Sequence, residues 1–587
     1  MVAEQFEVNE EIAKIFHRLG VFLDMDGVDF KPTAYQRAAA ILRTLDQSVA
    51  DIYRLSDIKG LEALEGIGKN LAYKIKEYLG TGKIQTYEKY LKLYPIDIDN
   101  LDEVPGLGPK TIKWLWEELG VKNVSDLKIA AEKGLVKNLP RGGAKLEQNI
   151  LNNLNLVETA NKRWLYAEIE PLAEKIKAQL EIVPGVSNLL ITGSYRRKKS
   201  TIGDLDYVTV ASKPTLVMDV FTNLQNPKVE EIISHGKTRS SIRLADGLEI
   251  DLRVVDKKSY GAACQYFTGS KEHNIELRKI AIAKGFKLNE YGLYKGVKQV
   301  AGSSEEEIYK MLGLRYIEPE LRENTGEIEW AQGKKKLDLI NIKDIKGDLH
   351  IHSDWDGGKE SISDLAEYAR LKLGYEYIGI SDHTKFLKIE RGLDEEQLMA
   401  QRLEIQKINA KYKDKHINFT ILQGCEANIL NDGSLDIRDT ILKQLDYVIA
   451  GLHSQLDMDR EEITARMLKA INNPYIDIIS HPFTGLINRR PQAKLDWGMI
   501  LTAAKQTGTI LEINANPLRL DLEAPKIREA KREGIKLVID SDTHSLEDMN
   551  QIEYGIGEAR RGWVVKEDII NTFLLAHLVK QFKRNVL

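Results

Sequence analysis

Three aspartates in the middle of the chain are spaced for joint metal binding. Asp204 and Asp206 lie two residues apart in the run GDLDYVTV, so on a strand both side chains point to the same face, about 6–7 Å apart. Asp251 follows in a second β-rich run, LEIDLRVV. Three carboxylates on one face repel one another unless cations lie between them. The pattern predicts that these aspartates bind two divalent ions.

A turn rich in hydrogen-bond donors precedes the first two aspartates. Gly193 and Ser194 offer backbone and hydroxyl donors, and residues 196–199 are four consecutive cations. This combination is typical of a triphosphate cradle. An Asp-x-Asp pair by itself is more often merely solvent-facing. With the turn and a third aspartate beside it, the site is suited to activating a 3′-hydroxyl and stabilising a departing pyrophosphate.

A second set of metal-ligand residues lies in the C-terminal half, each at the end of an apolar run that reads as a strand. The set consists of His350, His352, Asp356, His383, Glu426, His453, His481, Asp542 and His544. Nine nitrogen and oxygen ligands exceed what one ion can use, which implies a cluster of two or three ions. An isolated His at a strand end is more often a hydrogen-bonded structural residue, but here every candidate lies at a strand end.

A Gly-rich turn followed by an amphipathic helix occurs three times near the N-terminus, at 64–75, 104–115 and 139–150. Glycines let backbone N–H groups approach a phosphate, and the helix start adds partial positive charge. The pattern predicts contacts to a DNA backbone, independent of base sequence. The predicted contacts are Gly66, Gly68, Lys69, Gly106, Gly108 and Lys110. The alternative is a plain helix connection, and the third copy departs from the pattern at Arg141.

The elements that must position these residues change in type along the chain. Residues 1 to about 160 have helical periodicity, and β-branched runs next to helices then predict an α+β region. Residues 319–345 are polar and lack periodicity, which predicts a linker laid over the surface. From 346, β-rich runs alternate with helical ones, which favours a parallel sheet closed into an α/β barrel.

Composition sets few limits on function. The net charge is −4 with a pI near 6.3, so any nucleic-acid partner must be bound by local basic patches. The two cysteines, Cys264 and Cys425, lie in apolar segments and are expected to be packing residues in a reducing compartment. The chain contains no apolar run long enough to span a bilayer. We expect a soluble, cytoplasmic monomer.

The motifs GSYRR, GDLD, EIDLR and YFTGSKEHNIELR, in this order and spacing, resemble the palm and thumb of family X DNA polymerases over roughly residues 1–320. The resemblance implies that Asp204, Asp206 and Asp251 hold two Mg²⁺ or Mn²⁺ ions. It implies nucleotide binding by Gly193, Ser194, Arg197, Gly203, Tyr266, Phe267, Gly269, Asn274 and Arg278. Within that group, Tyr266 and Phe267 would disfavour a 2′-hydroxyl, and Asn274 and Arg278 would reach the minor groove.

The N-terminal helices resemble the small lyase domain of the same family, in which Lys74 falls at the position of the Schiff-base lysine. Removal of a 5′-deoxyribose phosphate by β-elimination needs a neutral amine on a phosphate-binding surface. Lys69 and Lys76 are candidates for the cations that would lower its pKa. Asn70 stands where a phosphate-binding Lys is expected, and an ordinary exposed lysine is the alternative for Lys74.

The nine C-terminal ligands resemble a PHP (polymerase and histidinol phosphatase) domain. The resemblance implies an Mn²⁺ or Zn²⁺ cluster that activates water for 3′→5′ exonuclease action and cleavage at abasic sites. The segment DLHIHSDWDGG is one residue short of the expected motif, which leaves Asp354 as an alternative to Asp356. Asp382 could support the ligands. Lys385, Arg489 or Arg519 could bind the phosphate, and the alternative is that they are plain surface charges.

The expected fold is therefore multidomain, with an all-α helix-hairpin-helix region, an α+β nucleotidyltransferase palm with a thumb, and a C-terminal α/β PHP barrel. The expected divisions are a lyase-like domain at 1–85, a fingers-like domain at 86–157, the palm at 158–256, the thumb at 257–318, the linker at 319–345 and the PHP domain at 346–587. The palm and the PHP domain are expected to fold separately across the linker.

The expected function is the filling of short gaps in DNA from dNTPs during base excision repair, with trimming of 3′ ends at the PHP site. Gapped or primer-template DNA is the expected partner. Two alternatives stay open, namely a PHP phosphatase with a degenerate polymerase half and a non-catalytic DNA scaffold. The first is disfavoured because all three palm aspartates and the YFTGS motif are present, and the second because both metal-ligand sets are complete in the sequence.

Overall fold

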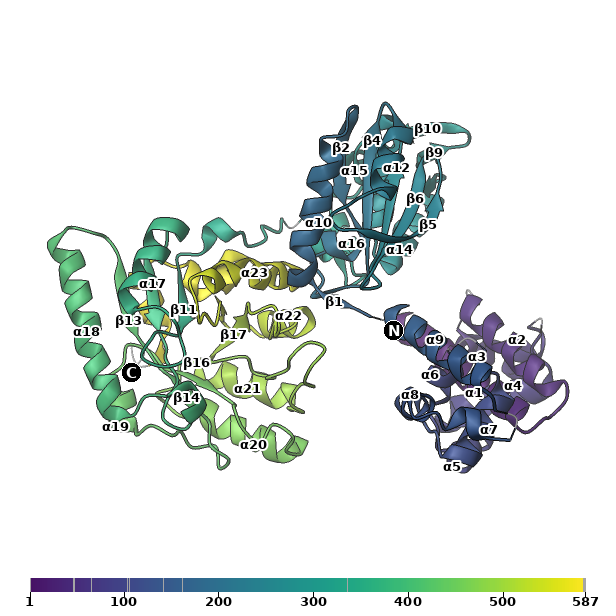
Figure 1. Ribbon diagram of the computed structural model, residues 1–587, viewed down its shortest axis with the longest axis horizontal. Helices are drawn as coiled ribbons and strands as arrows, with labels where there is room; N and C mark the ends of the chain where they lie inside the picture. The colour runs from purple at the N-terminus through teal and green to yellow at the C-terminus, as the bar shows by residue number, and fades with distance from the viewer. Residues whose placement is uncertain are drawn as a thin grey trace. The chain divides into compact units, whose positions relative to one another are not determined.

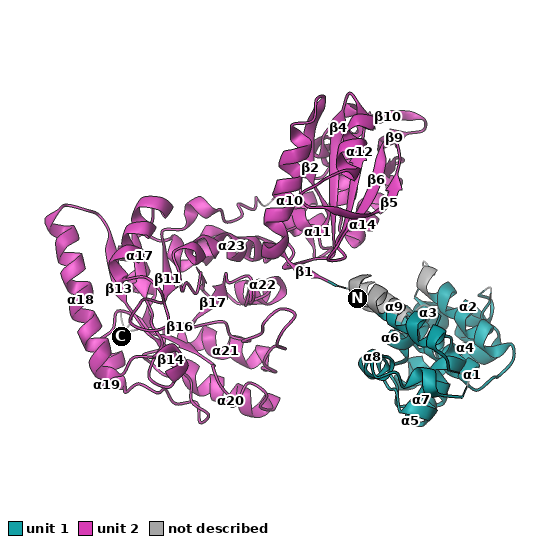
Figure 2. Ribbon diagram, in the orientation of Figure 1, with its two compact units in different colours: residues 1–162 teal, residues 163–587 magenta. Residues whose placement is uncertain are grey.

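The structure is a computed structural model that describes residues 2–583 apart from 46–47, 65, 103, 105, 141, 161 and 335. Arg141, in the third Gly-rich copy, therefore lies outside the described residues. The chain divides into two compact units, residues 1–162 and 163–587 (Figure 2). Within the described ranges, no helix combines the length and the apolar character needed to cross a membrane.

Unit 1 is entirely helical, as the periodicity predicted. Its α-helices are α1 (Val2–Met25), α2 (Lys31–Thr44), α3 (Val49–Glu62), α4 (Lys69–Thr81), α5 (Gln85–Leu93), α6 (Ile98–Asp102), α7 (Pro109–Leu119), α8 (Val124–Glu132) and α9 (Ala144–Ala160). Helix α1 contributes Ile12, Phe16 and Leu19 to a core that extends to α9 through Ile150. Burial of these apolar side chains stabilises helices that are individually short.

The Gly-rich turns lead into α4 and α7 as expected. Gly66 and Gly106 have φ angles of 83° and 82°, in the left-handed region that favours glycine. A Cβ at Gly66 would also lie 2.4 Å from Ile41 Cδ1. Gly68 and Gly108 are the N-cap residues of the two helices and have open space around them. Backbone N–H groups at both helix starts are therefore accessible to a phosphate.

Unit 2 begins with a five-stranded sheet of order β2-β4-β7-β6-β5, in which only β4 and β7 are parallel. Its strands are β2 (Val186–Ile191), β4 (Asp204–Ala211), β5 (Val229–His235), β6 (Arg239–Leu244) and β7 (Glu249–Val254). Helices α10 (Tyr166–Glu181) and α12 (Pro214–Thr222) share one apolar core with this sheet. The short strands β1 (Trp164–Leu165) and β3 (Thr201–Ile202) pair beside it, and α11 (Gly193–Arg196) follows β2.

A second small core follows the sheet. It contains the helices α13 (Tyr260–Thr268), α14 (Lys271–Ala283) and α15 (Glu305–Met311) and the hairpin strands β8 (Lys287–Asn289), β9 (Gly292–Lys295) and β10 (Lys298–Ala301). The same core includes Leu321, Ile328 and Ala331. The start of the expected linker is thus folded, with a 3₁₀ turn at Pro319–Leu321 and helix α16 at Glu327–Gln332.

The polar composition of residues 319–345 suggested an exposed segment, but part of it is buried. Arg322 and Glu327 are both fully buried, where each has a charged or polar partner. Arg322 Nη1 donates to Glu305 Oε1 at 2.6 Å, and Glu327 Oε1 lies 2.7 Å from His273 Nδ1. Buried charges are tolerated when they are paired in this way, so a charged sequence need not lie on the surface.

The remaining strands are parallel and form a barrel. They are β11 (Gly347–Ile351), β12 (Tyr377–Ile380), β13 (Thr420–Gln423), β14 (Glu426–Asn428), β15 (Ile449–Gly451), β16 (Ile478–Ile479), β17 (Ile510–Asn514) and β18 (Leu537–Asp540). The first strand closes on the last through His352 N, which donates to Thr543 O at 2.9 Å. The predicted α/β barrel is confirmed.

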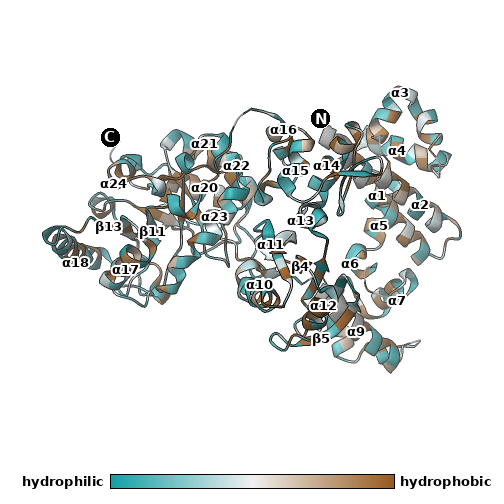
Figure 3. Cartoon of the chain, turned by 90° about the horizontal axis from the view of Figure 1, so that it is seen from above, coloured by the Kyte–Doolittle hydropathy of each residue, from teal (hydrophilic) through white to brown (hydrophobic). Residues whose placement is uncertain are grey.

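Helices surround this barrel (Figure 1). They are α17 (Ile362–Tyr368), α18 (Glu395–Asp414), α19 (Asp439–Leu442), α20 (Arg460–Ile471), α21 (Trp497–Thr507), α22 (Ala524–Arg532), α23 (Ile552–Arg561) and α24 (Leu575–Leu578). Helix α18 is coloured largely as hydrophilic and lies at the outer edge of unit 2 (Figure 3). Cys264 and Cys425 are both buried, in agreement with their predicted packing role.

Two candidate active sites and a lysine cleft

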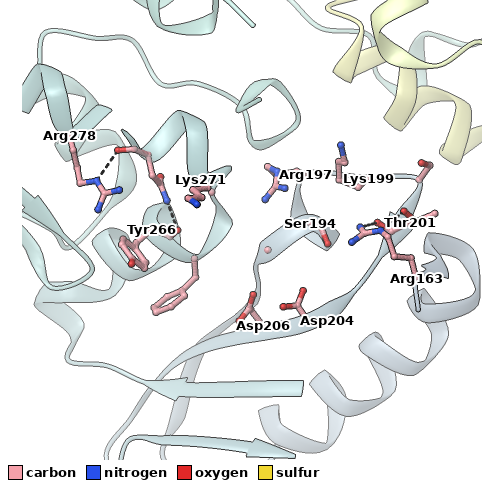
Figure 4. A pocket seen from close by; sticks show the side chains of 15 residues that line it. Arg163, Ser194, Arg197, Lys199, Thr201, Asp204, Asp206, Tyr266, Lys271 and Arg278 are labelled. Atoms are coloured by element: carbon pink, nitrogen blue, oxygen red, sulfur yellow. Dashed lines mark hydrogen bonds between the residues drawn. The ribbon is translucent and has the colours of Figure 1, made fainter. Parts of the chain in front are cut away.

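An open cleft of about 840 Å³ lies at the carboxyl side of β2 and the start of β4 (Figure 4). It is lined by Arg163, Gly193, Ser194, Arg197, Lys199, Ser200, Thr201, Asp204, Asp206, Tyr266, Phe267, Gly269, Lys271, Asn274 and Arg278. Most residues predicted to bind a nucleotide are therefore brought together here. Arg163 was missed because it lies outside the motifs, and Lys271 because the lysine within YFTGSKEHNIELR was given no role.

The three aspartates lie on adjacent parallel strands. Asp251 on β7 is directly paired with Asp206 on β4. Burial raises the pKa of Asp206 to about 7, and the charges of Asp204 and Asp251 act in the same direction. Burial and Asp251 also raise the pKa of Asp204. This mutual repulsion is what a bound divalent cation relieves, so the three carboxylates fit a metal site.

The turn at the start of α11 lies directly against these carboxylates. Gly193 has a φ of 62°, and a Cβ there would come 2.9 Å from Asp206 Oδ2. The Oγ of Ser194 is buried and has no hydrogen-bond partner within the described chain. A buried hydroxyl without a partner is costly unless a ligand supplies one. The turn therefore fits a bound polar group such as a phosphate.

Only part of the predicted basic cradle faces the cleft. Arg197 and Lys199 line it, whereas Arg196 points away and donates to Glu305 Oε2 at 2.6 Å. Lys198 donates to Tyr166 OH at 2.7 Å instead. Two of the four cations therefore face away from the cleft, because successive residues of a turn point in different directions.

The opposite wall of the cleft is built by α13 and α14. Tyr266 and Phe267 contact each other edge to face, with ring centroids 5.1 Å apart. Asn274 Nδ2 donates to the Tyr266 carbonyl at 2.8 Å, so this amide also fixes the turn (Figure 4). A Cβ on Gly269 would lie 3.1 Å from Arg197 Nη1. Gly203 plays a similar part, because a Cβ there would lie 3.0 Å from Arg163 Nη1.

A separate cleft of about 850 Å³ in unit 1 contains Lys74. Lys74 is half-buried, and its Nζ donates to Thr86 Oγ1 at 2.7 Å. Burial lowers the pKa of Lys74, and Lys31 lowers it further against an opposing contribution from Glu77. Lys69 lines the same cleft, but Lys76 points to the Tyr53 ring, 5.8 Å from its centroid. Lys31, and not Lys76, is the cation that acts on Lys74.

The nine predicted metal ligands converge at the carboxyl ends of the barrel strands. Glu426 lies at their centre, with its carboxylate oxygens 2.9 Å from His383 Nδ1, 3.1 Å from His481 Nε2 and 3.2 Å from His453 Nε2. Asp542 Oδ1 lies 3.4 Å from His352 Nε2 and 3.6 Å from His350 Nε2. His352, His383 and His544 offer ring nitrogens close enough for one ion.

Several of these ligand atoms have no hydrogen-bond partner within the described chain. They are His350 Nε2, His352 Nε2, His383 Nδ1, Glu426 Oε2, both ring nitrogens of His453, and His481 Nδ1. Burial disfavours a charged His352, yet Asp356 raises its pKa to about 10. Without cations, protonated imidazoles must balance the buried carboxylates. Divalent ions that displace those protons fit this donor set.

Two supporting carboxylates surround the ligands. Glu512 Oε1 lies 2.6 Å from His350 Nδ1, and Glu512 Oε2 accepts a hydrogen bond from His481 N at 2.6 Å. Such a partner fixes which ring nitrogen of His350 faces the ions. Glu512 was missed because it lies in the middle of the TILEINA strand, β17, and not at a strand end like the predicted ligands. Asp382 accepts hydrogen bonds from Ser353 and Gln401, consistent with a supporting role.

The structure also shows where the alternative ligand and the proposed phosphate-binding residues lie. Asp356 is buried with its Oδ2 2.7 Å from His352 Nδ1, whereas Asp354 is exposed. Among the proposed phosphate contacts, Arg519 Nε lies 3.5 Å from Asp542 Oδ2. Lys385 pairs with Glu395 on the surface and Arg489 is exposed, so both are placed as surface charges.

Comparison with known proteins agrees with this architecture. The DNA polymerase beta thumb family matches residues 263–323, and two helix-hairpin-helix families match residues 7–84 and 98–155. The protein named DNA polymerase/3′-5′ exonuclease PolX from Bacillus subtilis (strain 168) is 36% identical over 581 residues, which cover 98% of this chain and 99% of that protein. The chain belongs to the PolX family of DNA polymerases.

Two more distant relatives match parts of this PolX family member. DNA polymerase lambda of Arabidopsis thaliana is 26% identical over 349 residues, covering 54% of this chain and 62% of that protein. A protein named as a probable phosphatase in Thermoanaerobacter sp. (strain X514) is 32% identical over 178 residues, covering 28% of this chain and 70% of that protein. Membership of a polymerase and exonuclease family implies dependence on divalent metal ions, for which the chain offers buried His and Asp groups.

Proposed function

We propose that this PolX family member fills short gaps in DNA from dNTPs and trims 3′ ends at the metal centre of its barrel. The single observation that carries the first activity is the cleft in which Asp204 and Asp206 face Ser194, Arg197 and Lys199. Carboxylates for metal ions and donors for a triphosphate lie in one open space. The wall formed by Tyr266 and Phe267 closes it on the side of the sugar.

Each wall has its own task in nucleotide addition. Asp204, Asp206 and Asp251 would hold two Mg²⁺ or Mn²⁺ ions, which supply charge neutralisation at the attacking and leaving oxygens. Ser194 and Arg197 bind the triphosphate. Gly193, which has no Cβ, allows the turn that contains Ser194 to lie against Asp206. Tyr266 and Phe267 exclude a 2′-hydroxyl by contact. The helix starts at Gly68 and Gly108 bind the DNA backbone.

The barrel centre is proposed to bind two or three Mn²⁺ or Zn²⁺ ions through its nine ligands. Glu426 has contacts to several imidazoles at once, which suits a carboxylate shared between ions. Glu512 orients His350, and Arg519 beside Asp542 is placed to attract a phosphodiester.

A one-nucleotide-gapped duplex with a labelled primer, dNTPs and Mn²⁺ tests both activities by product length. We expect a primer one nucleotide longer with dNTPs and shortened primers without them. A small-molecule phosphatase with a degenerate polymerase half would give no extension, and a DNA scaffold would change neither length. Either of those outcomes contradicts the proposal.

Lowering the pH should weaken metal binding in the polymerase cleft. Because the pKa of Asp206 is raised to about 7, protons compete with divalent ions for this carboxyl below that pH. From pH 8 to pH 6.5 we expect the Mg²⁺ concentration for half-maximal extension to rise about fourfold, and saturating Mg²⁺ to restore the rate. Primer extension over a Mg²⁺ series at both pH values measures this, with DNA affinity in EDTA as the control. An unchanged Mg²⁺ requirement would count against it.

The cleft around Lys74 supports a second proposed activity, removal of a 5′-deoxyribose phosphate. A half-buried amine with a lowered pKa, with Lys31 and Lys69 in the same cleft, suits imine formation beside a phosphate. This activity is a proposal that rests on the chemistry of the cleft.

Substitution of Lys74 by alanine should abolish covalent trapping on a 5′-deoxyribose-phosphate substrate by borohydride, with at least about a tenfold loss. Lys76→Ala is the matched control, because Lys76 lies on the same helix but faces Tyr53 outside the cleft. The trapped product is quantified on a denaturing gel. Equal trapping by Lys74→Ala and wild type would place the nucleophile elsewhere.

A further inference from the structure

Helix α23 of the barrel region packs directly against the palm. Tyr554 OH donates to Glu170 Oε2 at 2.9 Å, and its ring contacts Tyr166 edge to face. A Cβ added at Gly557 would touch the Lys198 side chain at 3.4 Å. The polymerase cleft and the barrel therefore share a packed interface inside unit 2, which residues in α23 form (Figure 1).

One residue of this helix reaches the cleft's phosphate-binding arginine. Arg561 Nη1 donates to the backbone carbonyl of Arg197 at 3.0 Å and to Glu323 Oε1 at 3.1 Å. Arg197 Nε donates to the same Glu323 oxygen at 3.0 Å. Arg561 is thus tied both to the backbone of Arg197 and, through one shared carboxylate, to its side chain. A C-terminal segment, drawn in yellow, is visible near Arg197 and Lys199 in Figure 4.

Burial and two neighbouring carboxylates restrict the Arg561 side chain. The Arg561 side chain is only 9% exposed, and its Nε lies 3.3 Å from Glu558 Oε2 on the same helix. Glu558 Oε1 in turn accepts a hydrogen bond from Ala524 N at 2.7 Å. The guanidinium of Arg561 is therefore held between two carboxylates, one from α23 and one from the segment that follows the thumb. Long side chains fixed in this way lose little entropy when they position a neighbour.

Charge gives Arg561 a second effect on the cleft. Glu323 is close to Arg197, Arg561 and Lys199, whose charges lower its pKa against the effect of burial. Arg197 and Lys199 line the nucleotide cleft, whereas Arg561 does not. Without Arg561, the Glu323 carboxylate would be neutralised by the two cleft cations alone. It would then compete with a triphosphate for both of them.

We propose that Arg561 is a positioning residue for nucleotide binding, which holds Arg197 at the cleft through the Arg197 carbonyl and the shared Glu323 carboxylate. The inference rests on the proposed gap-filling function and on the triphosphate role of Arg197. It assigns to the barrel region a part in polymerisation that is separate from its metal centre. The affected ligand is the triphosphate of the incoming nucleotide.

The test compares Arg561→Gln with Arg560→Gln in the full-length chain. Arg560 is a matched control on the same helix, because it also crosses the interface, to Glu320 Oε1 at 2.8 Å, but has no contact with Arg197. We expect Arg561→Gln to raise the KM for dNTP about tenfold while kcat changes less than about threefold. Arg560→Gln should leave the KM within about twofold of wild type. Both variants should retain wild-type trimming of single-stranded 3′ ends.

A double-variant cycle separates positioning from a general structural effect. If Arg561 acts through Arg197, adding Arg561→Gln to Arg197→Gln should raise the KM no further, whereas independent effects would multiply. An unchanged KM in Arg561→Gln, or multiplying effects, would overturn the inference. Should Arg561→Gln fail to fold, Arg561→Lys provides the same comparison with an intermediate KM expected. Failure of the proposed function is distinguishable, because the wild-type chain would then not extend a gapped primer.

Discussion

Asp206→Asn should abolish nucleotide addition while leaving 3′-end trimming at the wild-type rate. Asparagine keeps the shape of the side chain but removes a charged ligand at the centre of the three carboxylates. Loss of a metal ligand should reduce kcat for extension by about 10³-fold or more, equivalent to about 4 kcal/mol of transition-state stabilisation. Single-turnover extension of a gapped primer measures the loss, and digestion of a single-stranded oligonucleotide measures the trimming.

The same substitution should not weaken the fold. The raised pKa of Asp206 means that the folded state binds this proton more tightly than the unfolded state does. The stability that this proton confers is complete at low pH and is lost as the pH rises towards about 7. In EDTA at pH 8 we therefore expect Asp206→Asn to melt at a higher temperature than wild type.

Asp219→Asn, an exposed acid on α12 of the same domain, is the matched control and should change neither extension nor melting temperature. Extension by Asp206→Asn at more than a tenth of the wild-type rate would show that the metal-ligand assignment is wrong. A large fall in its melting temperature would instead show that Asp206 is a structural residue.

Site residues that repeat at the two-residue spacing of a β-strand could be predicted from the sequence. Asp204 and Asp206 share a strand face, and His350 and His352 do the same, because side chains alternate along a strand. The Gly66 and Gly106 turns could be recognised because left-handed backbone favours glycine. The spacing alone therefore assigns each of these aspartate and histidine pairs to one face of a strand.

Contacts between distant segments could not be predicted in this way. Glu512 supports His350 from a strand that begins more than 150 residues later, and nothing near Glu512 in the sequence marks that partner. Arg163 and Lys271 line the polymerase cleft, but neither belongs to a cluster of cations in the sequence. Their roles depend on how the strands and helices pack, which spacing along the chain does not encode.

The structure differs most from the sequence-based expectation in the relation of the palm to the barrel, which were expected to fold separately. Charged residues between 319 and 333 suggested an exposed linker, but Arg322 and Glu327 are buried with partners in the thumb core. Residues 163–587 form one compact unit. A variant in the barrel can therefore affect the polymerase cleft through α23, and tests of the barrel must avoid that helix.

Replacement of both His350 and His352 by alanine should eliminate 3′-end trimming and abasic-site cleavage. The two imidazoles lie on one strand and both approach Asp542 Oδ1, at 3.6 and 3.4 Å, so they serve the same part of the centre. Their removal takes two donors from the group His350, His352 and Asp542, whose ligand atoms lie close enough together to hold one ion. We expect at least a 10³-fold loss of hydrolysis, about 4 kcal/mol in the barrier.

Gap filling should continue within about twofold of wild type. The substitutions lie on and next to β11, whereas the proposed link to the polymerase cleft runs through Arg561 on α23. A labelled primer followed with and without dNTPs, first in Mn²⁺ and then in Mg²⁺, gives both rates in one experiment. His577→Ala is the matched control, since His577 is exposed in the same region and lies outside the ligand set. Glu426→Gln removes the central charge with little change of volume, and should reproduce the loss if the double variant is unstable.

The double variant also decides how far the two sites depend on each other. Continued shortening of the primer would place the exonuclease outside the barrel. If trimming stops and extension also falls more than tenfold, the variant's melting temperature distinguishes two causes. A large fall in melting temperature would mean that the barrel is destabilised, so that α23 no longer positions Arg197. An unchanged melting temperature would mean that the imidazoles themselves contribute to extension, which contradicts the assignment of the two chemistries to separate sites.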